Sequence, residues 1–335
     1  MLQELLQKKY GIKVADEFRI ESYEACKTDQ ELYLLVPIGG MEREDLFELE
    51  QMVNHLIQYG DRHVSQFKKT EEGEPVIEWK DGRYIVLVNK SFDSPTNRNI
   101  GRKLSKFHYR GRLLNVRMNR LSRIGQWKVL WEKRLDQMEK VWTDLLQKET
   151  ETEFDRMFLE SFPYYMGLTE NAIQYLTDTE FDDEPAPVDS GTVCHVRFGS
   201  HSWGKQYFVK NPFDWVFDHC SRDLAEWTRE RYFRNIQTYE PDVKHFLADY
   251  QSVIRLSPFS WRLLYARLMF PLHFFDCVEN YYITNSEQQR YTLQDQFQKY
   301  LDQTREHEKF LGNFYQLAEV PVRSFGIPEL EWLKK

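Results

Sequence analysis

The chain has 335 residues and a formal net charge of −8, from 45 lysines and arginines against 53 aspartates and glutamates. This charge argues against nucleic acid as a partner of the whole protein. Its four cysteines lie far apart without C-x-x-C spacing, which predicts reduced cytosolic thiols rather than a disulfide framework. The length allows one large domain or two lobes, and an aromatic content of 15% predicts a well-packed core.

Two segments bear on targeting. The opening residues, MLQELLQKKYGIKV, have no long apolar core and no small-residue cleavage site, so they do not predict a signal peptide. The most apolar run, residues 263–275, contains Arg267, Pro271 and His273. It is too short and too polar to span a bilayer, so we expect no membrane insertion.

The first 93 residues predict three strands, a helix and a hairpin. The helix, residues 42–59, carries apolar side chains at helical spacing and ends at Gly60. A Lys-Asp-Gly turn then joins two strands. The strands are expected at residues 12–14, 18–23, 32–38, 75–79 and 83–89.

A basic stretch follows a predicted turn and lobe boundary at residues 94–97. No acidic residue occurs from Ser94 to Trp131. On an acidic chain this indicates either a docking surface for an acidic or phosphate-bearing partner, or a solvated flexible loop. Aromatic residues are sparse here, so single-stranded nucleic acid is not expected. The docking candidates are Arg98, Arg102, Lys103, Arg110, Arg112, Arg117, Arg120 and Arg123.

Most of the remaining chain has helical periodicity. Pro163 is expected to interrupt one helical region, and Pro271 to kink or break another. The predicted helices cover residues 99–108, 126–147, 153–162, 171–175, 243–256, 260–281 and 287–317.

Residues 192–227 organise the rest of the chain. We expect a strand at 192–198, a polar turn at 199–204 and a second strand at 205–210. Pro212 then ends the pairing, because proline has no N–H for a ladder, and a helix begins near Ser221.

Taken alone, this stretch leaves three interpretations open. One is an ordinary hairpin with a buried histidine. Another is a zinc site, although neighbouring residues on a strand point to opposite faces. A Cys–His nucleophile is the third. The residues concerned are Cys194, His195, His201, His219 and Cys220.

The order of motifs resembles the active-site core of the aminoglycoside phosphotransferase and choline kinase-like families. Those families write it as His-Gly-Asp, five residues, Asn, then Ile-Asp-Phe-Asp and a later Asp-Leu. Leu-Ser-Lys-Phe-His at 104–108 is similar to their Leu-Ala-x-Phe-His. Within them, Phe-Asp-Trp-Val-Phe-Asp-His at 213–219 and Arg-Asp-Leu-Ala-Glu-Trp at 222–227 resemble the CotS and YutH group of endospore coat proteins.

This resemblance implies an α+β, two-lobed protein kinase-like fold. The small lobe, residues 1–93, would hold an antiparallel sheet and one helix. The large lobe, residues 94–335, would be mostly helical and would carry the degenerate catalytic hairpin of residues 192–227.

The catalytic positions depart from the family pattern. His195 stands where the family has its histidine, but Val196 and Arg197 replace the glycine and the aspartate. That aspartate accepts the substrate proton in a kinase, and arginine cannot. Ser202 falls at the metal-binding asparagine, and Pro212 at the main metal carboxylate.

Two aspartates keep a place in the pattern. In a shifted register, Asp214 itself becomes the metal carboxylate. The resemblance makes Asp223 a buried, fold-holding carboxylate, which needs hydrogen-bond partners because an unpaired buried charge is costly.

The small lobe also lacks nucleotide-binding parts. The connection from Val14 to Phe18 has no glycine, and the strand at 32–38 has no lysine. Lys27 is expected in a turn, pointing to water. Glu48 or Glu50 could be the helix glutamate of a kinase, but the acidic helix favours a solvated face for both.

The resemblance and its departures together imply a non-catalytic, kinase-like spore-coat-associated protein. It would be made in the mother-cell cytoplasm and assembled onto the spore coat through other spore coat proteins, with no cofactor. One alternative is an active small-molecule phosphotransferase that uses Asp214, ATP and Mg²⁺. Another is a pseudokinase that binds a nucleotide or phosphate, with Arg197 pairing to the phosphate.

Overall fold

A computed structural model describes residues 2–14, 16–70, 72–80, 82–94, 99–148 and 152–333. The chain groups into two compact units. The lobes expected on either side of residue 93 stay a prediction, because these units are defined by contacts and not by chain order. Unit 1 comprises Met1–Arg123, Gly191–Asp223 and Asp249–Ile254, and unit 2 comprises Ile124–Ser190, Leu224–Ala248 and Arg255–Lys335.

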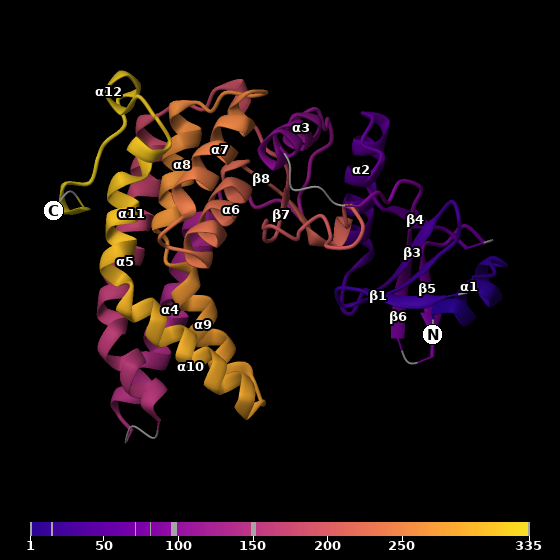
Figure 1. Ribbon diagram of the computed structural model, residues 1–335, viewed down its shortest axis with the longest axis horizontal. Coiled ribbons are helices and arrows are strands. Elements are labelled where there is room, and N and C mark those ends of the chain that lie inside the picture. The colour runs from indigo at the N-terminus through magenta and orange to yellow at the C-terminus, as the bar shows by residue number, and fades with distance from the viewer. Residues whose placement is uncertain are drawn as a thin grey trace. The chain divides into compact units, whose positions relative to one another are not determined.

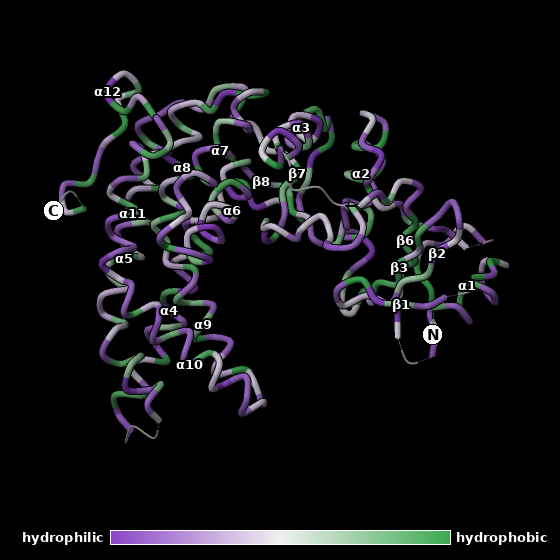
Figure 2. The backbone as a smooth tube through the Cα atoms, viewed as in Figure 1, coloured by the Kyte–Doolittle hydropathy of each residue, from purple (hydrophilic) through white to green (hydrophobic). Residues whose placement is uncertain are grey.

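Unit 1 is built on an antiparallel sheet in the order β1-β2-β3-β6-β4, with β5 also paired to β6 (Figure 1). Its central strand β3 has five consecutive buried residues, which fits a strand covered on both faces. Figure 2 shows β3 and β6 as mostly hydrophobic. The strands are β1 Glu17–Ile20, β2 Tyr23–Lys27, β3 Leu32–Pro37, β4 Gln66–Lys68, β5 Val76–Trp79 and β6 Gly82–Asn89.

The predicted antiparallel sheet is confirmed, but its first strands lie elsewhere than expected. Residues 12–14 form no strand. The segment 18–23 is the end of β1, a turn at Glu21–Ser22 and the start of β2. Strand β4 was not predicted. Its three residues are too short to show a periodicity.

Two helices accompany the sheet, where one was predicted. The expected helix is α2, Arg43–Gln58, and the additional one is α1, Leu2–Tyr10. The side chains of Leu2, Leu5 and Leu6 are fully buried in a core cluster with residues of β2 and β3. Their i, i+3, i+4 spacing is that of one helical face.

The hairpin of unit 1 pairs β7, Thr192–His195, with β8, Trp215–Asp218. The predicted second strand at 205–210 is therefore wrong, and the first strand ends at His195 rather than at residue 198. A 3-10 turn, Pro212–Asp214, leads directly into β8. Tyr207 and Lys210 pack onto the sheet side of unit 1 instead of alternating along a strand.

Glu48 of α2 is buried, contrary to the solvated face that its acidic helix predicts. It is 6% exposed and accepts backbone N–H groups from Asn119 at 2.8 Å, Arg120 at 3.1 Å and Leu121 at 2.9 Å. Next along the chain, the backbone of Arg123 and Leu121 bonds to Phe217 of β8. Glu48 thereby joins α2 to the hairpin.

Unit 2 consists of packed helices. The helix α6 begins in unit 1 and α7 ends there. Among the helices of the described residues, none combines the length and apolarity that crossing a bilayer requires. The helices after α3 Ile100–Arg112 are α4 Trp127–Leu146, α5 Glu153–Asp182, α6 Ser221–Arg234, α7 Tyr239–Gln251, α8 Pro258–Met269, α9 Leu272–Ile283, α10 Glu287–Asp302, α11 Thr304–Leu317 and α12 Val322–Phe325.

Pro163 does not interrupt its helix. It lies inside the continuous α5, where two shorter helices were predicted. A proline leaves the carbonyl four residues earlier without its helical donor. That carbonyl belongs to Leu159, and the indole N–H of Trp142 on α4 donates to it at 3.1 Å. The neighbouring helix therefore replaces the missing bond.

Pro271 separates α8 from α9, so of the expected kink or break the structure shows the break. The expected single helix at 287–317 is corrected, because it breaks at Gln303 into α10 and α11.

The role of Glu48 gives a first prediction. Glu48→Ala leaves three backbone donors without their acceptor, so the free energy of unfolding should fall by at least about 2 kcal/mol. The matched control is Glu50→Ala on the same helix, where the partly exposed pair with Lys69 is worth less than about 1 kcal/mol. Urea unfolding followed by tryptophan fluorescence measures both. Equal losses in the two variants would contradict this role for Glu48.

Candidate functional site

The centre of unit 1 is the carboxylate of Asp223, in the first turn of α6. It is fully buried and accepts three hydrogen bonds. The backbone N–H of His195 donates to Oδ1 at 2.9 Å, and Nδ1 of His195 lies 2.7 Å from Oδ2. Nε2 of His108 lies 3.1 Å from the same oxygen. Whether Asp223 holds the fold stays a prediction, but its burial and partners are those that the role requires.

The other hydrogen-bond partners of His195 and His108 indicate which ring nitrogen carries the proton. The indole N–H of Trp203 can only donate, and it lies 2.9 Å from Nε2 of His195. His195 therefore carries its proton on Nδ1, facing Asp223. The hydroxyl of Tyr250 lies 2.9 Å from Nδ1 of His108, which leaves Nε2–H of His108 for the carboxylate. Both histidines are neutral in this arrangement.

The pKa values follow from the same contacts. Burial alone would raise the pKa of Asp223, but the adjacent His195 and the hydrogen bonds from both histidines hold it well below its usual value. Burial lowers the pKa of His108 to about 4, against the opposing effect of Asp223. The carboxylate of Asp223 is thus ionised and the ring of His108 neutral near pH 7.

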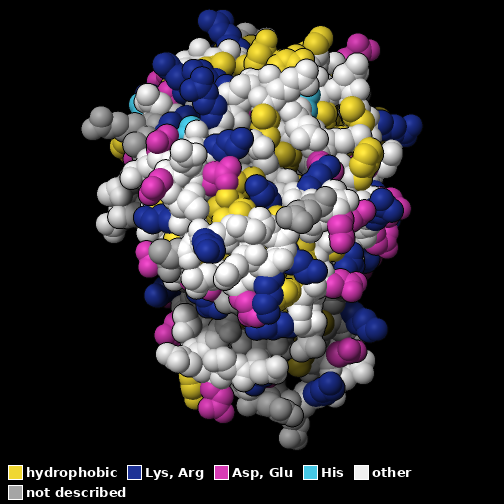
Figure 3. All heavy atoms as spheres, turned by 90° about the vertical axis from the view of Figure 1, so that its right-hand side faces the viewer, with side chains coloured by type: hydrophobic (Ala, Val, Ile, Leu, Met, Phe, Trp, Pro, Cys, Tyr) yellow, Lys and Arg dark blue, Asp and Glu magenta, His cyan; other side chains and the backbone are white. Residues whose placement is uncertain are grey.

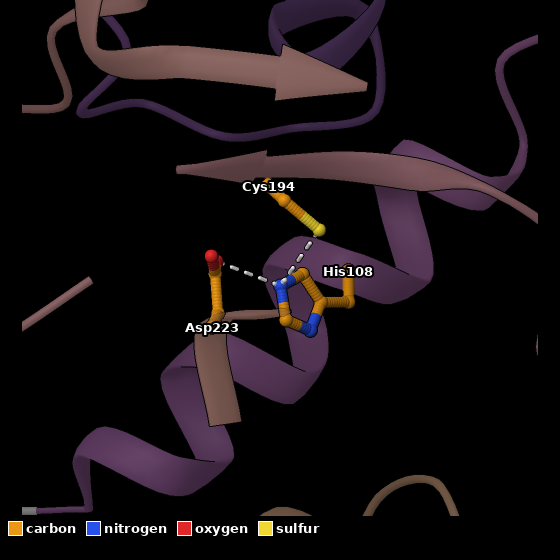
Figure 4. A group of neighbouring side chains, drawn as sticks. All are labelled: His108, Cys194 and Asp223. Atoms are coloured by element: carbon orange, nitrogen blue, oxygen red, sulfur yellow. Dashed lines mark hydrogen bonds and ion pairs between the residues drawn. The ribbon is translucent and has the colours of Figure 1, made fainter. Parts of the chain in front are cut away.

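One group of metal-ligating side chains overlaps this network: His108, Cys194 and Asp223 (Figure 4). Their donor atoms are already engaged, since His108 donates to Asp223 and the Cys194 thiol lies 3.4 Å from the carbonyl of His219. Burial raises the pKa of Cys194 well above its usual value, which disfavours the thiolate that zinc requires. Of the five metal candidates from the sequence, Cys194 alone belongs to this group.

The family resemblance aligns the next two residues, Val196 and Arg197, with the glycine and the aspartate of the kinase pattern. Val196 is 46% exposed, and its N–H bonds the carbonyl of Asp214 at 2.7 Å. Arg197 is also exposed. The hydroxyl of Ser202 accepts the N–H of Gly199 at 2.7 Å and donates to the carbonyl of Arg197 at 3.2 Å, so it closes the turn.

Asp214 is the carboxylate that the hairpin brings beside these positions. Because His195 pairs with Trp215, the residue before Trp215 lies next to Val196. Burial raises the pKa of Asp214 to about 6, while His195 lowers it and Glu21 raises it further. Pro212 lies in the preceding 3-10 turn and offers no ligand atom in its side chain.

The segment from Trp203 to Lys210 packs against the sheet and against Phe92 and Asp93, which lie between β6 and α3. The ring of Tyr207 lies 6.0 Å from Phe18 of β1 and 5.8 Å from Phe92, measured between ring centroids. The N–H of Phe208 donates to the carbonyl of Asp93 at 2.7 Å. We call residues 203–210 the inserted segment.

Lys210 anchors the C-terminal end of the inserted segment. Its ammonium is buried, forms an ion pair with Asp61, and lies 4.6 Å from the ring of Trp203. Its backbone N–H donates to the carbonyl of His63 at 2.8 Å. Sequence reasoning missed this site, because nothing local marks Lys210 as buried or links it to Asp61, which lies 149 residues away.

Two described features of the first 93 residues depart from the nucleotide-binding parts of a kinase. The turn between β1 and β2 is Glu21–Ser22, without glycine, and β3 has no lysine. Lys27 is exposed at the end of β2 and its Nζ lies 3.4 Å from the hydroxyl of Tyr207. Glu48 is engaged by backbone groups, as described above.

Most of the basic stretch has partners within unit 1. The guanidinium of Arg112 is buried, Lys103 lies over the ring of Phe208 at 4.9 Å, and Arg117 is exposed. Arg123 donates to the carbonyls of Arg120 and Ser122. Arg98 lies outside the described residues, so the docking role of the stretch stays a prediction. The ion pairs are Arg102 with Asp249, Arg110 with Asp61, and Arg120 with Glu42 and Asp45.

Solved structures with a similar fold are small-molecule kinases. An aminoglycoside phosphotransferase from Alicyclobacillus acidocaldarius aligns with a TM-score of 0.70 and 15% identity, covering 95% of this chain and 97% of the other. An AMP-bound spectinomycin phosphotransferase gives 0.61 and 13%, over 96% and 98%. A microcompartment-associated aminopropanol kinase gives 0.60 and 12%, over 95% and 98%. The predicted kinase-like fold is confirmed.

The family follows from sequence. The family model "Spore coat putative kinase YutH" matches residues 3–314. The endospore coat-associated protein YutH of Bacillus subtilis (strain 168) is 39% identical over 338 aligned positions, covering 100% of this chain and 99% of that protein. This chain belongs to the YutH family of spore coat proteins, as the resemblance predicted.

The buried histidine gives a second prediction. A folded-state pKa below the ordinary 6.5 means that His108 stabilises the fold above pH 6.5 and that this stability is lost as the pH falls towards 4. In His108→Gln, whose amide can still donate to Asp223, that titration is absent. Between these pH values, the free energy of unfolding of the wild type should fall more steeply than that of the variant, by up to about 1.4 kcal/mol per pH unit.

Urea unfolding at a series of pH values measures the two slopes. Other buried histidines, such as His307, contribute to both proteins equally and cancel in the difference. Identical slopes would show that His108 does not titrate in this range on unfolding.

Proposed function

We propose that this protein is a non-catalytic, kinase-like protein that is associated with the spore coat and acts through contacts with other proteins. Its family and the coat-associated relative in Bacillus subtilis support the coat location. The kinase-like fold supplies a rigid scaffold, and fold alone does not imply activity.

The observation that carries this proposal is the inserted segment. A kinase covers its nucleotide phosphates with a glycine-rich loop of the small-lobe sheet and holds them with a lysine on β3. Here Tyr207 packs against β1 and against Phe92, and Phe208 bonds the backbone of Asp93. We infer that the protein's own side chains occupy the space that a nucleotide needs.

The catalytic positions support the same conclusion. A positioned base contributes about 10²–10⁴ in rate, which is about 3–5.5 kcal/mol of barrier. Arg197 stands at the base position and cannot accept a proton at neutral pH. With Ser202 closing a turn, the asparagine of the family pattern is also missing. Phosphoryl transfer by this site is therefore not expected.

A second candidate function is metal-dependent nucleotide binding through Asp214. The observation that favours it is position, because the hairpin register brings Asp214 next to Val196. With a pKa of about 6, its carboxyl is ionised at pH 7 and offers an oxygen ligand for Mg²⁺. Arg197 could then pair with a phosphate.

Thermal unfolding with and without millimolar Mg²⁺–ATP separates the two candidates. A ligand at 100 times its Kd would stabilise the native protein by about 2.7 kcal/mol, which such a scan detects readily. We expect no shift for the wild type and none for Asp214→Asn. A Mg²⁺-dependent shift in the wild type that disappears in Asp214→Asn would establish the second candidate instead.

A further inference from the structure

A hollow of about 570 Å³ is lined by residues of α2 and of the loop at 116–120. Its lining includes the side chains of Phe47, which is 59% exposed, and Val116, which is 43% exposed. Such exposed apolar surface in a concave site is typical of a binding surface. Figure 3 shows one face of the molecule on which hydrophobic side chains lie among charged side chains of both signs.

Three arginines and two glutamates line this hollow. Arg43 and Arg117 line it, are exposed, and make no hydrogen bond or ion pair with any residue that the structure describes. Arg120 is paired with Glu42 and Asp45, while buried Glu48 is held by backbone donors. Glu44 is the exposed acidic residue of the lining. The hollow therefore suits an apolar side chain with acidic neighbours.

The same chain presents such a group at the C-terminal end of α5. Phe181 is 84% exposed, the largest exposed fraction among the exposed large hydrophobic side chains of the described residues. Its neighbours are Glu180, Asp182, Asp183 and Glu184. Arg262, whose side chain is almost buried, pairs with Asp182 and Asp183, and Glu184 is exposed.

This acidic end contradicts a local rule. The C-terminus of a helix is the negative end of its dipole and favours lysine or arginine, yet the last turn of α5 has no basic residue. An exposed phenylalanine adds a second local cost. Arg262 compensates Asp182 and Asp183, but among the described residues no such compensation is seen for the exposed ring of Phe181, as is expected at a functional site.

We propose that the Phe181 end of α5 in one copy docks into the α2 hollow of a second copy. Phe181 contacts Phe47 and Val116, and the acidic neighbours of Phe181 face Arg43 and Arg117. The contact joins two different surfaces, so it is heterologous and can repeat from copy to copy into a chain or an array. A contact made by one aromatic side chain and a few charged neighbours is weak by itself. Many copies of this contact in a coat would together give strong association.

This inference deepens the proposed function, because it rests on the idea that the protein works through protein contacts. It names the partner as another copy of the same chain. The reason is charge and shape complementarity between two exposed features that the chain itself carries. Because opposite charges contribute, association should weaken as salt is added.

Sedimentation equilibrium at increasing protein concentration tests the contact. The average mass of the wild type should rise with concentration, whereas Phe47→Ser and Phe181→Ser should each remain monomeric. An equimolar mixture of the two variants keeps one intact hollow and one intact Phe181 end, so it should form dimers and nothing larger. The matched control, Tyr291→Ser, removes a side chain that is 70% exposed on α10 and should associate like the wild type.

Several results would overturn the proposal. These are a monomeric wild type at all concentrations, a single variant that associates like the wild type, or a mixture that stays monomeric. The substituted side chains are mostly exposed, and circular dichroism checks that each variant is folded. A Mg²⁺–ATP effect would overturn the proposed lack of catalysis without touching the self-association, so the two failures are distinguishable.

Discussion

The buried carboxylate of Asp223 in α6 joins three elements of unit 1, because it accepts hydrogen bonds from His108 of α3 and His195 of β7. An ionised group without solvent exposure costs several kcal/mol unless hydrogen bonds compensate it, and here His195 and His108 supply them. The network fixes the end of β7 against α3 and the start of α6. Trp203 extends it into the inserted segment by donating to His195. The inserted segment is therefore linked to the carboxylate of Asp223 through Trp203 and His195.

The chain thus has a kinase-like fold, while the residues that the family resemblance places at the catalytic and nucleotide-binding positions differ from those of a kinase. Glu48 illustrates the change, because it holds the loop at Asn119–Leu121 rather than a lysine of β3. Lys210 is a buried lysine, but it pairs with Asp61 and lies over Trp203. These contacts hold the loop at Asn119–Leu121 and the end of the inserted segment in place, and the proposal of a non-catalytic protein rests partly on them.

The sequence predicted the order of motifs well, since His195, Asp214 and Asp223 carry local signatures. The predictions of secondary structure and burial failed where residues far away in the sequence determine them. The segment 205–210 contains Tyr, Phe and Val, which favour strands, but the contacts of Tyr207 with Phe18 and of Lys210 with Asp61 prevail. Pro163 stays helical because Trp142 of another helix serves the carbonyl of Leu159. The burial of Glu48 likewise depends on backbone donors more than 70 residues away. By contrast, the apolar spacing of α1 was visible locally.

Hydrogen exchange of the inserted segment tests the central claim most directly. The amide of Phe208 donates to Asp93 and that of Lys210 to His63, so peptides covering 203–210 should exchange slowly. If the segment occupies the nucleotide's place permanently, millimolar Mg²⁺–ATP should leave this protection unchanged. Exchange as fast as in an unstructured peptide, or protection that changes when Mg²⁺–ATP is added, would contradict the account.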